Sequence, residues 1–95
     1  MNEFCFEVHV NVDDATGEVL AGYFRIRKGR VHETIEFADG NVFADYNKNG
    51  ELLGIELLGP CKTSIVDQIA PEESTQLRSR TKRFMKNSGP RQLVA

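Results

Sequence analysis

One cysteine and two histidines are the side chains best suited to hold a metal or to form a nucleophile and base pair. Cys5 and His9 fall on one face of a predicted N-terminal strand, and His32 lies on the third predicted strand. No CxxC or HxxxH spacing accompanies them, and the intervening strand would separate the two histidines by about 10 Å. Neither Cys5 nor Cys61 has a Gly-rich or helix N-terminal context that would activate a thiolate. We therefore expect surface histidines and free thiols, and the sequence leaves a Cys5–Cys61 disulfide open.

Acidic side chains are the second group that could do chemistry, and they comprise Glu33, Glu36, Asp39, Asp45 and Glu56. Carboxylates that alternate along strands usually form the solvated face of a sheet. From Asp45 onward the spacing D-x-N-x-N-G resembles a calcium loop that includes Asn47 and Asn49, with Glu56 six residues after Gly50. No helices are predicted to flank this loop, so its Asn and Gly residues are better explained as turn residues. We expect no metal, no cofactor and no enzymatic activity.

A basic segment near the C-terminus is the strongest asymmetry in the chain. Residues 1–70 contain six Lys and Arg against twelve Asp and Glu, a net charge of −6, whereas residues 71–95 contain six against two, a net charge of +4. These cations are candidate contacts for an acidic protein partner, nucleic-acid phosphates or an anionic surface. The pI near 5.6 and the absence of interleaved aromatic residues disfavour nucleic acid. The candidate partner-binding residues are Arg78, Arg80, Lys82, Arg83 and Lys86.

These cations belong to a predicted amphipathic helix from Pro71 to Asn87. Proline suits a first helical turn, the two glutamates that follow suit the positive end of the helix dipole, and Asn-Ser-Gly-Pro is a typical stop. An apolar stripe on the helix predicts docking on the sheet with the cations in solvent, whereas the charge alone would suit a binding tail. The stripe, within an arc of about 100°, consists of Leu77, Thr81, Phe84 and Met85.

Five predicted strands precede this helix. Strict alternation of apolar and polar residues from Phe4 to Val12 predicts the first, and the second and third follow at about Glu18–Arg27 and Val31–Phe37. Asn47-Lys48-Asn49-Gly50 separates the arms of a β-hairpin that ends at Gly59-Pro60. Short turns at about ten-residue spacing predict antiparallel pairing in sequential order, one to five. The predicted fold class is α+β, an antiparallel β-meander of about five strands with a C-terminal amphipathic helix.

The same pattern divides the chain into a meander domain over residues 1–70, a basic helix over 71–88 and a flexible tail over 89–95. Between Cys61 and Ala70, Ser64 and Asp67 resemble a capping box, and this segment is compatible with either a helical turn or a sixth short strand. With sequential pairing, Arg25 and Arg27 would lie outward among acidic neighbours of the adjacent strands, Glu7 and Glu36.

Self-association is expected because the fifth strand is apolar on both faces and one thin helix cannot cover both. In a sequential meander, strands one and five would also be exposed edges. We therefore expect a homodimer. The candidate dimer or packing residues are Leu52, Leu58, Leu77, Phe84 and Met85.

A run of matching residue types extends over about Gly17 to Cys61: a strand, a Gly turn, an acidic strand and then a D-Y-x-x-x-G-x-x-x-G-I-E-L-L hairpin. The matching residues are Gly29, Val31, Glu33, Asp45, Tyr46, Gly50, Gly54, Ile55, Glu56 and Leu58. In this segment the chain resembles the bacterial domain of unknown function 2283 family. The resemblance implies the sheet but no established activity, cofactor or catalytic residue. An association of such proteins with neighbouring toxin-like genes makes an antitoxin-like regulator the alternative function.

Composition limits the remaining choices. At 95 residues the chain is long enough for one domain with a modest core, and its 40% hydrophobic and 27% charged residues are ordinary for a globular protein. No apolar run approaches the roughly 20 residues that span a bilayer, and the N-terminus lacks the basic start of a signal peptide. We expect a cytoplasmic, non-enzymatic protein-interaction module, homodimeric and without a membrane partner. The alternative regulator would bind nucleic acid or a partner protein through the basic helix.

Overall fold

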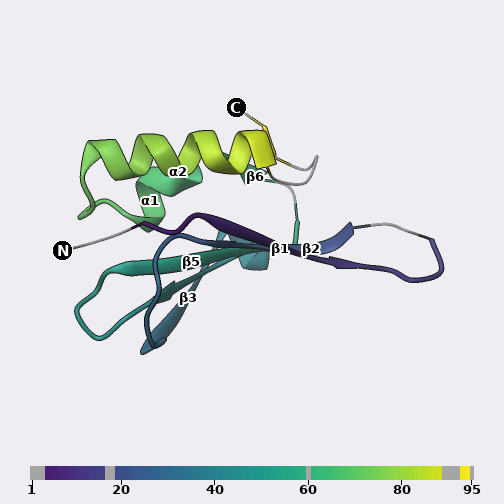
Figure 1. The fold of residues 1–95 in the computed structure, drawn as a ribbon, viewed down its shortest axis with the longest axis horizontal. Coiled ribbons are helices and arrows are strands. Elements are labelled where there is room, and N and C mark those ends of the chain that lie inside the picture. The colour runs from purple at the N-terminus through teal and green to yellow at the C-terminus, as the bar shows by residue number, and fades with distance from the viewer. Residues whose placement is uncertain (1–3, 17–18, 60, 89–92, 95) are drawn as a thin grey trace.

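A computed structural model describes residues 4–16, 19–59, 61–88 and 93–94. Among these residues, a short helix, a longer helix and one short strand pair accompany a five-stranded antiparallel sheet (Figure 1). In chain order the elements are β1 (Glu7–Val12), β2 (Val19–Arg25), β3 (Glu33–Phe37), the 3-10 turn η1 (Ala38–Gly40), β4 (Val42–Tyr46), β5 (Leu52–Leu57), β6 (Cys61–Lys62), α1 (Ile65–Ile69), α2 (Thr75–Ser88) and β7 (Leu93–Val94).

The sheet has the spatial order β1-β2-β5-β4-β3, so the predicted α+β class is confirmed and the predicted sequential order is wrong. β2 pairs with β5, with Phe24 opposite Ile55, and the segment between β2 and β3 crosses to the far edge. The physical reason lies in β5, LLGIEL, which has one charged residue among six, is buried along almost its whole length and is therefore best placed in the centre of the sheet. The edge strands are β1 and β3. The fifth strand, which was predicted to be the second edge, is central.

A β-bulge in β5 determines that Leu52 joins the core cluster, while Leu53, also buried, lies against the loop at Gly29. Asp45 pairs with Gly54, but the next residue of β4, Tyr46, pairs with Leu52, which leaves Leu53 as the extra residue. The carbonyl of Leu53 accepts hydrogen bonds from the N–H groups of Ile26, at 2.8 Å, and Arg27, at 3.3 Å. Leu52 is consequently turned toward the core and is 1% exposed.

Both helices cover one face of the sheet (Figure 1). Residues of β2, β4 and β5 form the sheet side of the core, and α1 and α2 supply the other side. The segment between Cys61 and Ala70 contains both predicted alternatives, the strand β6 followed by the helix α1. The buried cluster consists of Phe24, Ile26, Val42, Ala44, Leu52, Ile55, Leu57, Ile65, Val66, Ile69, Ala70, Leu77 and Met85.

The helix starts differ from the sequence prediction. Ser64 precedes α1 but makes no side-chain cap bond, so the predicted capping box is wrong. α2 begins at Thr75 rather than Pro71, because the Ser74 hydroxyl accepts a hydrogen bond from the Leu77 N–H at 3.1 Å and so caps the helix four residues later. Beyond α2, Leu93–Val94 form β7, which pairs in parallel with β6. The rest of the predicted flexible tail lies outside the described residues.

The β1–β2 hairpin projects past the helices and gives the molecule its long axis (Figure 1). The principal extents are 42 × 26 × 25 Å. Among the described residues, no helix is both long enough and apolar enough to cross a membrane.

Candidate interaction surface

Aromatic side chains connect the start of β1 to helix α2. The ring of Phe6 lies 5.4 Å from that of Phe84, centroid to centroid, and Phe84 meets Phe24 edge-on at 5.6 Å. Phe4 lies 6.0 Å from Phe6 on the other side. The helix stripe predicted from the sequence is confirmed, since Leu77, Thr81 and Met85 are buried and Phe84 packs against the core. Each such ring contact contributes about 1 kcal/mol of stability beyond that from the buried surface area.

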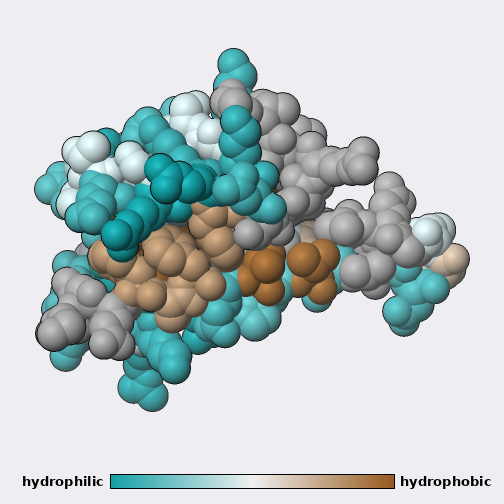
Figure 2. All heavy atoms as spheres, turned by 45° about the horizontal axis from the view of Figure 1, so that its top comes forward, coloured by the Kyte–Doolittle hydropathy of each residue, from teal (hydrophilic) through white to brown (hydrophobic). Residues whose placement is uncertain are grey.

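A shallow pocket of about 360 Å³ opens between this aromatic row and the cations of α2. Figure 2 shows hydrophobic surface gathered beneath the hydrophilic face of the helix and continuing toward the projecting hairpin. The sequence did not indicate this cluster, because 74 positions separate Phe6 from Arg80 along the chain. The residues that line the pocket are Phe6, Arg80, Arg83, Phe84 and Asn87.

The five predicted partner-binding cations fall into two groups. Asp67 of α1 accepts from Lys82 at 2.7 Å and from Arg78 at 3.3 Å. The hydrogen bond from Lys82, with the charges of both cations, holds the pKa of the Asp67 carboxyl below its ordinary value. Arg80, Arg83 and Lys86 make no ion pair within the described part of the chain. The unpaired cations therefore include both arginines of the pocket.

β1 is an edge strand, so one side of its backbone carries hydrogen-bonding groups without a neighbouring strand. On the face that it shares with the core residue Phe24, Val8 is only half-buried and Val10 is 43% exposed. We call the apolar surface formed by Phe4, Phe6, Val8 and Val10 the β1 patch. It runs from the pocket toward the tip of the hairpin.

The candidate dimer residues lie mostly elsewhere. Leu52, Leu77 and Met85 belong to the protein's own core, and Phe84 is partly buried against it. Leu58, directly after β5, is 47% exposed, and its N–H donates to the carbonyl of Asn41 at 2.8 Å. The bulge turns Leu52 to the core side with Ile55 and Leu57 and leaves Gly54 and Glu56 on the other face, so β5 does not have the two apolar faces that suggested a dimer.

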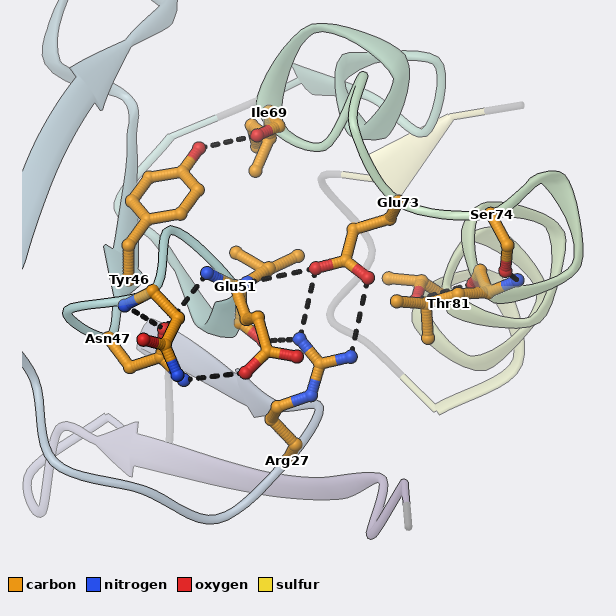
Figure 3. A network of polar contacts seen from close by, with 11 residues as sticks. Arg27, Tyr46, Asn47, Glu51, Ile69, Glu73, Ser74 and Thr81 are labelled. Carbon is orange, nitrogen blue, oxygen red and sulfur yellow. Dashed lines mark hydrogen bonds and ion pairs between the residues drawn. The ribbon is translucent and has the colours of Figure 1, made fainter. Parts of the chain in front are cut away.

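A buried ion pair fastens the helical layer to the sheet (Figure 3). Arg27 is 7% exposed and binds Glu73 with both terminal guanidinium nitrogens, Nη1 and Nη2, at 3.0 and 3.3 Å. The same arginine donates to the carbonyl of Leu52 at 3.0 Å, and Glu73 accepts from the Leu52 N–H at 3.1 Å. Burial alone would raise the pKa of the Glu73 carboxyl, but these hydrogen bonds outweigh it and lower that pKa.

This pair corrects the expected placement of two arginines. Arg25 does lie opposite Glu7 across β1 and β2, as expected, but β3 is too far away for Glu36 to join them. Arg27 follows the end of β2 and turns inward, with its guanidinium 5.4 Å from the ring of Phe4. No local sequence signal identifies its partner, which is 46 residues away.

The residues whose spacing resembles a calcium loop form hydrogen bonds within the sheet and its turn instead. Asp45 accepts from the Tyr23 hydroxyl at 3.0 Å and from Thr34 at 2.6 Å. Burial, together with the bond to this carboxylate, raises the pKa of Tyr23 to about 12. Asn47 Oδ1 accepts from the N–H groups of Asn49 and Glu51, both at 2.9 Å. The loop is thus built by turn chemistry.

The candidate Cys–His residues are not brought together. β1 and β3 form opposite edges of the sheet, so His9 and His32 lie about four interstrand spacings apart, roughly 19 Å. Cys5 and Cys61 are free thiols, and burial raises the pKa of the Cys61 thiol. Within the described residues, no group of three or more His, Cys, Asp or Glu side chains is placed to hold a metal ion.

Comparison with known protein families identifies part of the sheet. No curated protein and no solved structure is significantly similar to the chain. Residues 21–59 match the family described as "Protein of unknown function (DUF2283)". The matched segment extends from β2 through β5, whereas β1, α1 and α2 lie outside it. Over that segment, the chain resembles the DUF2283 family.

Proposed function

We propose that the protein is a small, non-enzymatic protein-interaction module whose interface is the open edge of β1 with the β1 patch, and that its first partner is a second copy of itself. The observation that carries the proposal is an edge strand whose apolar residues are only partly covered, with Val10 43% exposed, next to a pocket lined by two arginines that make no ion pair with any described residue. The raised pKa of the Cys61 thiol supports a non-enzymatic role, and two free cysteines suit a reducing, cytoplasmic setting.

The projecting hairpin supports pairing with another strand. A two-stranded hairpin without a covering layer is marginally stable in water, and the β1–β2 hairpin extends past the helices (Figure 1). Antiparallel pairing of two β1 strands would give each hairpin a third strand and would join the two sheets into one of ten strands. It would also cover Val10, the most exposed member of the β1 patch.

The sequence of β1 is self-complementary in one register. With Val8 of one copy opposite Val10 of the other, apolar residues meet on the helix side of the sheet and His9 faces its own copy. The same register carries the acidic turn at Asp13 and Asp14 of one copy to the start of β1 in the other, where Arg80 and Arg83 line the pocket. Charge complementarity therefore favours a second copy as the occupant.

The test uses one residue on each edge of the sheet. Val10 on β1 and Ile35 on β3 are both exposed apolar residues, at 43% and 38%, on the helix side of the sheet. Val10→Lys places a charge inside the proposed interface and should weaken the dimer about tenfold or more in sedimentation equilibrium. Ile35→Lys is the matched control and should leave the dissociation constant unchanged. A dimer weakened only by Ile35→Lys would place the interface on β3 and refute the proposal.

The second candidate is a bacterial, antitoxin-like regulator that binds nucleic acid through α2. One observation favours it: Phe6 and Phe84 lie beside Arg80 and Arg83. Aromatic rings can stack on the bases of single-stranded nucleic acid while arginines bind its phosphates. Single-strand binding that is lost in Arg80→Gln/Arg83→Gln and kept in Arg78→Gln/Lys82→Gln would favour this candidate. The second pair of substitutions removes the same charge from residues that Asp67 already neutralises.

A further inference from the structure

Another pocket, of about 380 Å³, lies between two loops and away from the β1 edge of the sheet. One loop joins β2 to β3, and the other is the turn between β4 and β5. The loops are held together because the His32 N–H donates to the carbonyl of Tyr46 at 2.8 Å. The residues that line this loop pocket are Gly29, Arg30, Val31, His32, Asn47, Lys48 and Asn49.

The wall formed by the turn is preorganised. Besides its two backbone contacts through Oδ1, Asn47 donates from Nδ2 to a carboxylate oxygen of Glu51 at 3.0 Å (Figure 3). Its own N–H donates to the carbonyl of Glu51, and its carbonyl accepts from Gly50, both at 3.0 Å. Gly50 has φ of 81°, which suits glycine. Asn47 thus fixes the position of Lys48 and engages the acidic group of the turn.

The opposite wall depends on Gly29. A Cβ at this position would lie 2.8 Å from a methyl carbon of Leu53, the bulge residue of β5. The absence of a side chain therefore lets the loop lie directly on the hairpin, and the next residue, Arg30, reaches the pocket. Both walls are part of the segment that matches the DUF2283 family.

The loop pocket is positively charged within an acidic part of the chain. Residues 1–70 have a net charge of −6, yet Arg30 and Lys48 line the pocket and no Asp or Glu does. Neither cation makes an ion pair or a side-chain hydrogen bond with any described residue. His32 can add a third donor. A pocket of this composition attracts an anion.

Backbone donors reinforce this charge. Among the described residues, the N–H groups of Gly29, Arg30, Val31 and Lys48 have no intramolecular acceptor. Free N–H groups next to an arginine and a lysine are the donors that phosphate oxygens accept from. Val31 is half-exposed and provides an apolar surface at the same site.

We propose that the loop pocket binds a phosphate group carried on a small organic molecule, with Arg30 and Lys48 on the phosphate and Val31 against the organic part. The volume lies in the range of about 300–1,000 Å³ typical of small-molecule sites and is larger than a bare phosphate needs. The same chemistry could come from a free phosphorylated compound or from the end of a nucleic-acid strand, and the experiment separates the two sources.

The experiment is a titration followed by amide chemical shifts. The probes are inorganic phosphate, ribose 5-phosphate, adenosine 5′-monophosphate and a 5′-phosphorylated single-stranded oligonucleotide, with unphosphorylated adenosine as the control. We expect the phosphorylated compounds to shift residues 29–32 and 47–49 and to bind more tightly than either inorganic phosphate or adenosine. Tightest binding by the oligonucleotide would identify a strand end as the source. Equal affinity for inorganic phosphate and the organic phosphates would overturn the assignment of an organic ligand.

Matched variants identify the site. Arg30→Gln/Lys48→Gln should weaken the binding of the organic phosphates about tenfold or more, because both charge-assisted contacts are lost. Lys28→Gln/Lys62→Gln removes the same charge from residues that do not line the pocket, and it should change the affinity much less. Equal weakening in both pairs would show nonspecific attraction and refute the site. Val10→Lys should retain phosphate binding even as a monomer, so failure here and failure of the dimer proposal are distinguishable.

Discussion

At Gly54 the backbone of β5 and the ring of Tyr23 share one small space. A Cβ at Gly54 would lie 2.1 Å from the Tyr23 hydroxyl oxygen and 2.4 Å from the ring carbon that carries it. The tyrosine crosses over this glycine to donate to Asp45 on β4, which also accepts from Thr34 on β3. One residue without a side chain therefore allows a hydrogen-bonded link across four strands.

Gly54→Ala should consequently destabilise the protein by about 1–3 kcal/mol, because the ring must move and give up its bond to Asp45. Urea denaturation measures the free energy of unfolding. In a Tyr23→Ala background the same substitution should cost much less, since the ring is already absent. An equal loss of stability in both backgrounds would mean that the Tyr23 ring is not the reason why Gly54→Ala is destabilising.

Arg27 and Glu73 form the other residue-scale link. Removing one member of this partly buried pair leaves an uncompensated charge on Arg27, so Glu73→Gln should cost about 1–3 kcal/mol. Arg27→Met/Glu73→Gln should recover part of that loss, because no buried charge remains and the glutamine oxygen can still accept from Leu52. Thermal unfolding of the single and double variants checks this. A double variant less stable than both single ones would show that the charges are not coupled.

The lowered pKa of Glu73 also predicts a pH dependence. The folded state has the lower pKa, so the carboxylate stabilises the protein fully above the unfolded-state value of about 4.3, and this stabilisation disappears as the pH falls through the folded-state value. The wild type should therefore lose stability on acidification below about pH 4 more steeply than Glu73→Gln. Parallel stability curves for the two proteins over this range would contradict the linkage.

At the scale of elements, the five main strands and the two-layer arrangement could be predicted from alternation and turn residues. The strand order could not, because short turns suggested sequential neighbours and the loop over residues 26–32 instead crosses to the far edge. A usable signal was present: β5 has one charged residue among six, as central strands often do, while β1 and β3 alternate with polar residues. The bulge at Leu53 had no local signal, and it determines that Leu52 rather than Leu53 joins the core cluster under the helices.

The candidate interaction surface was predictable only within one element. Periodicity identified the apolar stripe and the cations of α2, but it could not show which cations are neutralised. Asp67 lies on a different helix, 11 and 15 residues from Arg78 and Lys82, and it forms ion pairs with these two cations. The contact between Phe6 and Phe84 likewise depends on tertiary packing.

The start of α2 provides an element-scale prediction. Ser74 accepts from the Leu77 N–H and caps the helix, whereas Ser64 stands before α1 without a side-chain cap bond. Ser74→Ala should therefore cost about 1 kcal/mol and Ser64→Ala close to nothing, as measured by chemical denaturation. The two serines are matched in type and exposure. Equal costs would contradict the assignment of Ser74 as the cap.

At the scale of the whole molecule, the two proposed surfaces occupy different parts of the sheet. The β1 edge and the α2 cations lie outside the segment that resembles the DUF2283 family, whereas the loop pocket lies inside it. Self-association through β1 would leave the loop pocket open, because β1 is separated from β3 and β4 by two strands or more. A dimer of this kind would present two loop pockets at opposite ends of one continuous sheet.

The mass of the unmodified protein in solution tests the central claim most directly. Multi-angle light scattering over a concentration series at micromolar levels should give about twice the chain mass of 10.7 kDa, and the value should fall toward 10.7 kDa on dilution. The predicted dimer should also become weaker in Val10→Lys and remain intact in Ile35→Lys. A mass of 10.7 kDa at every concentration would contradict pairing through β1.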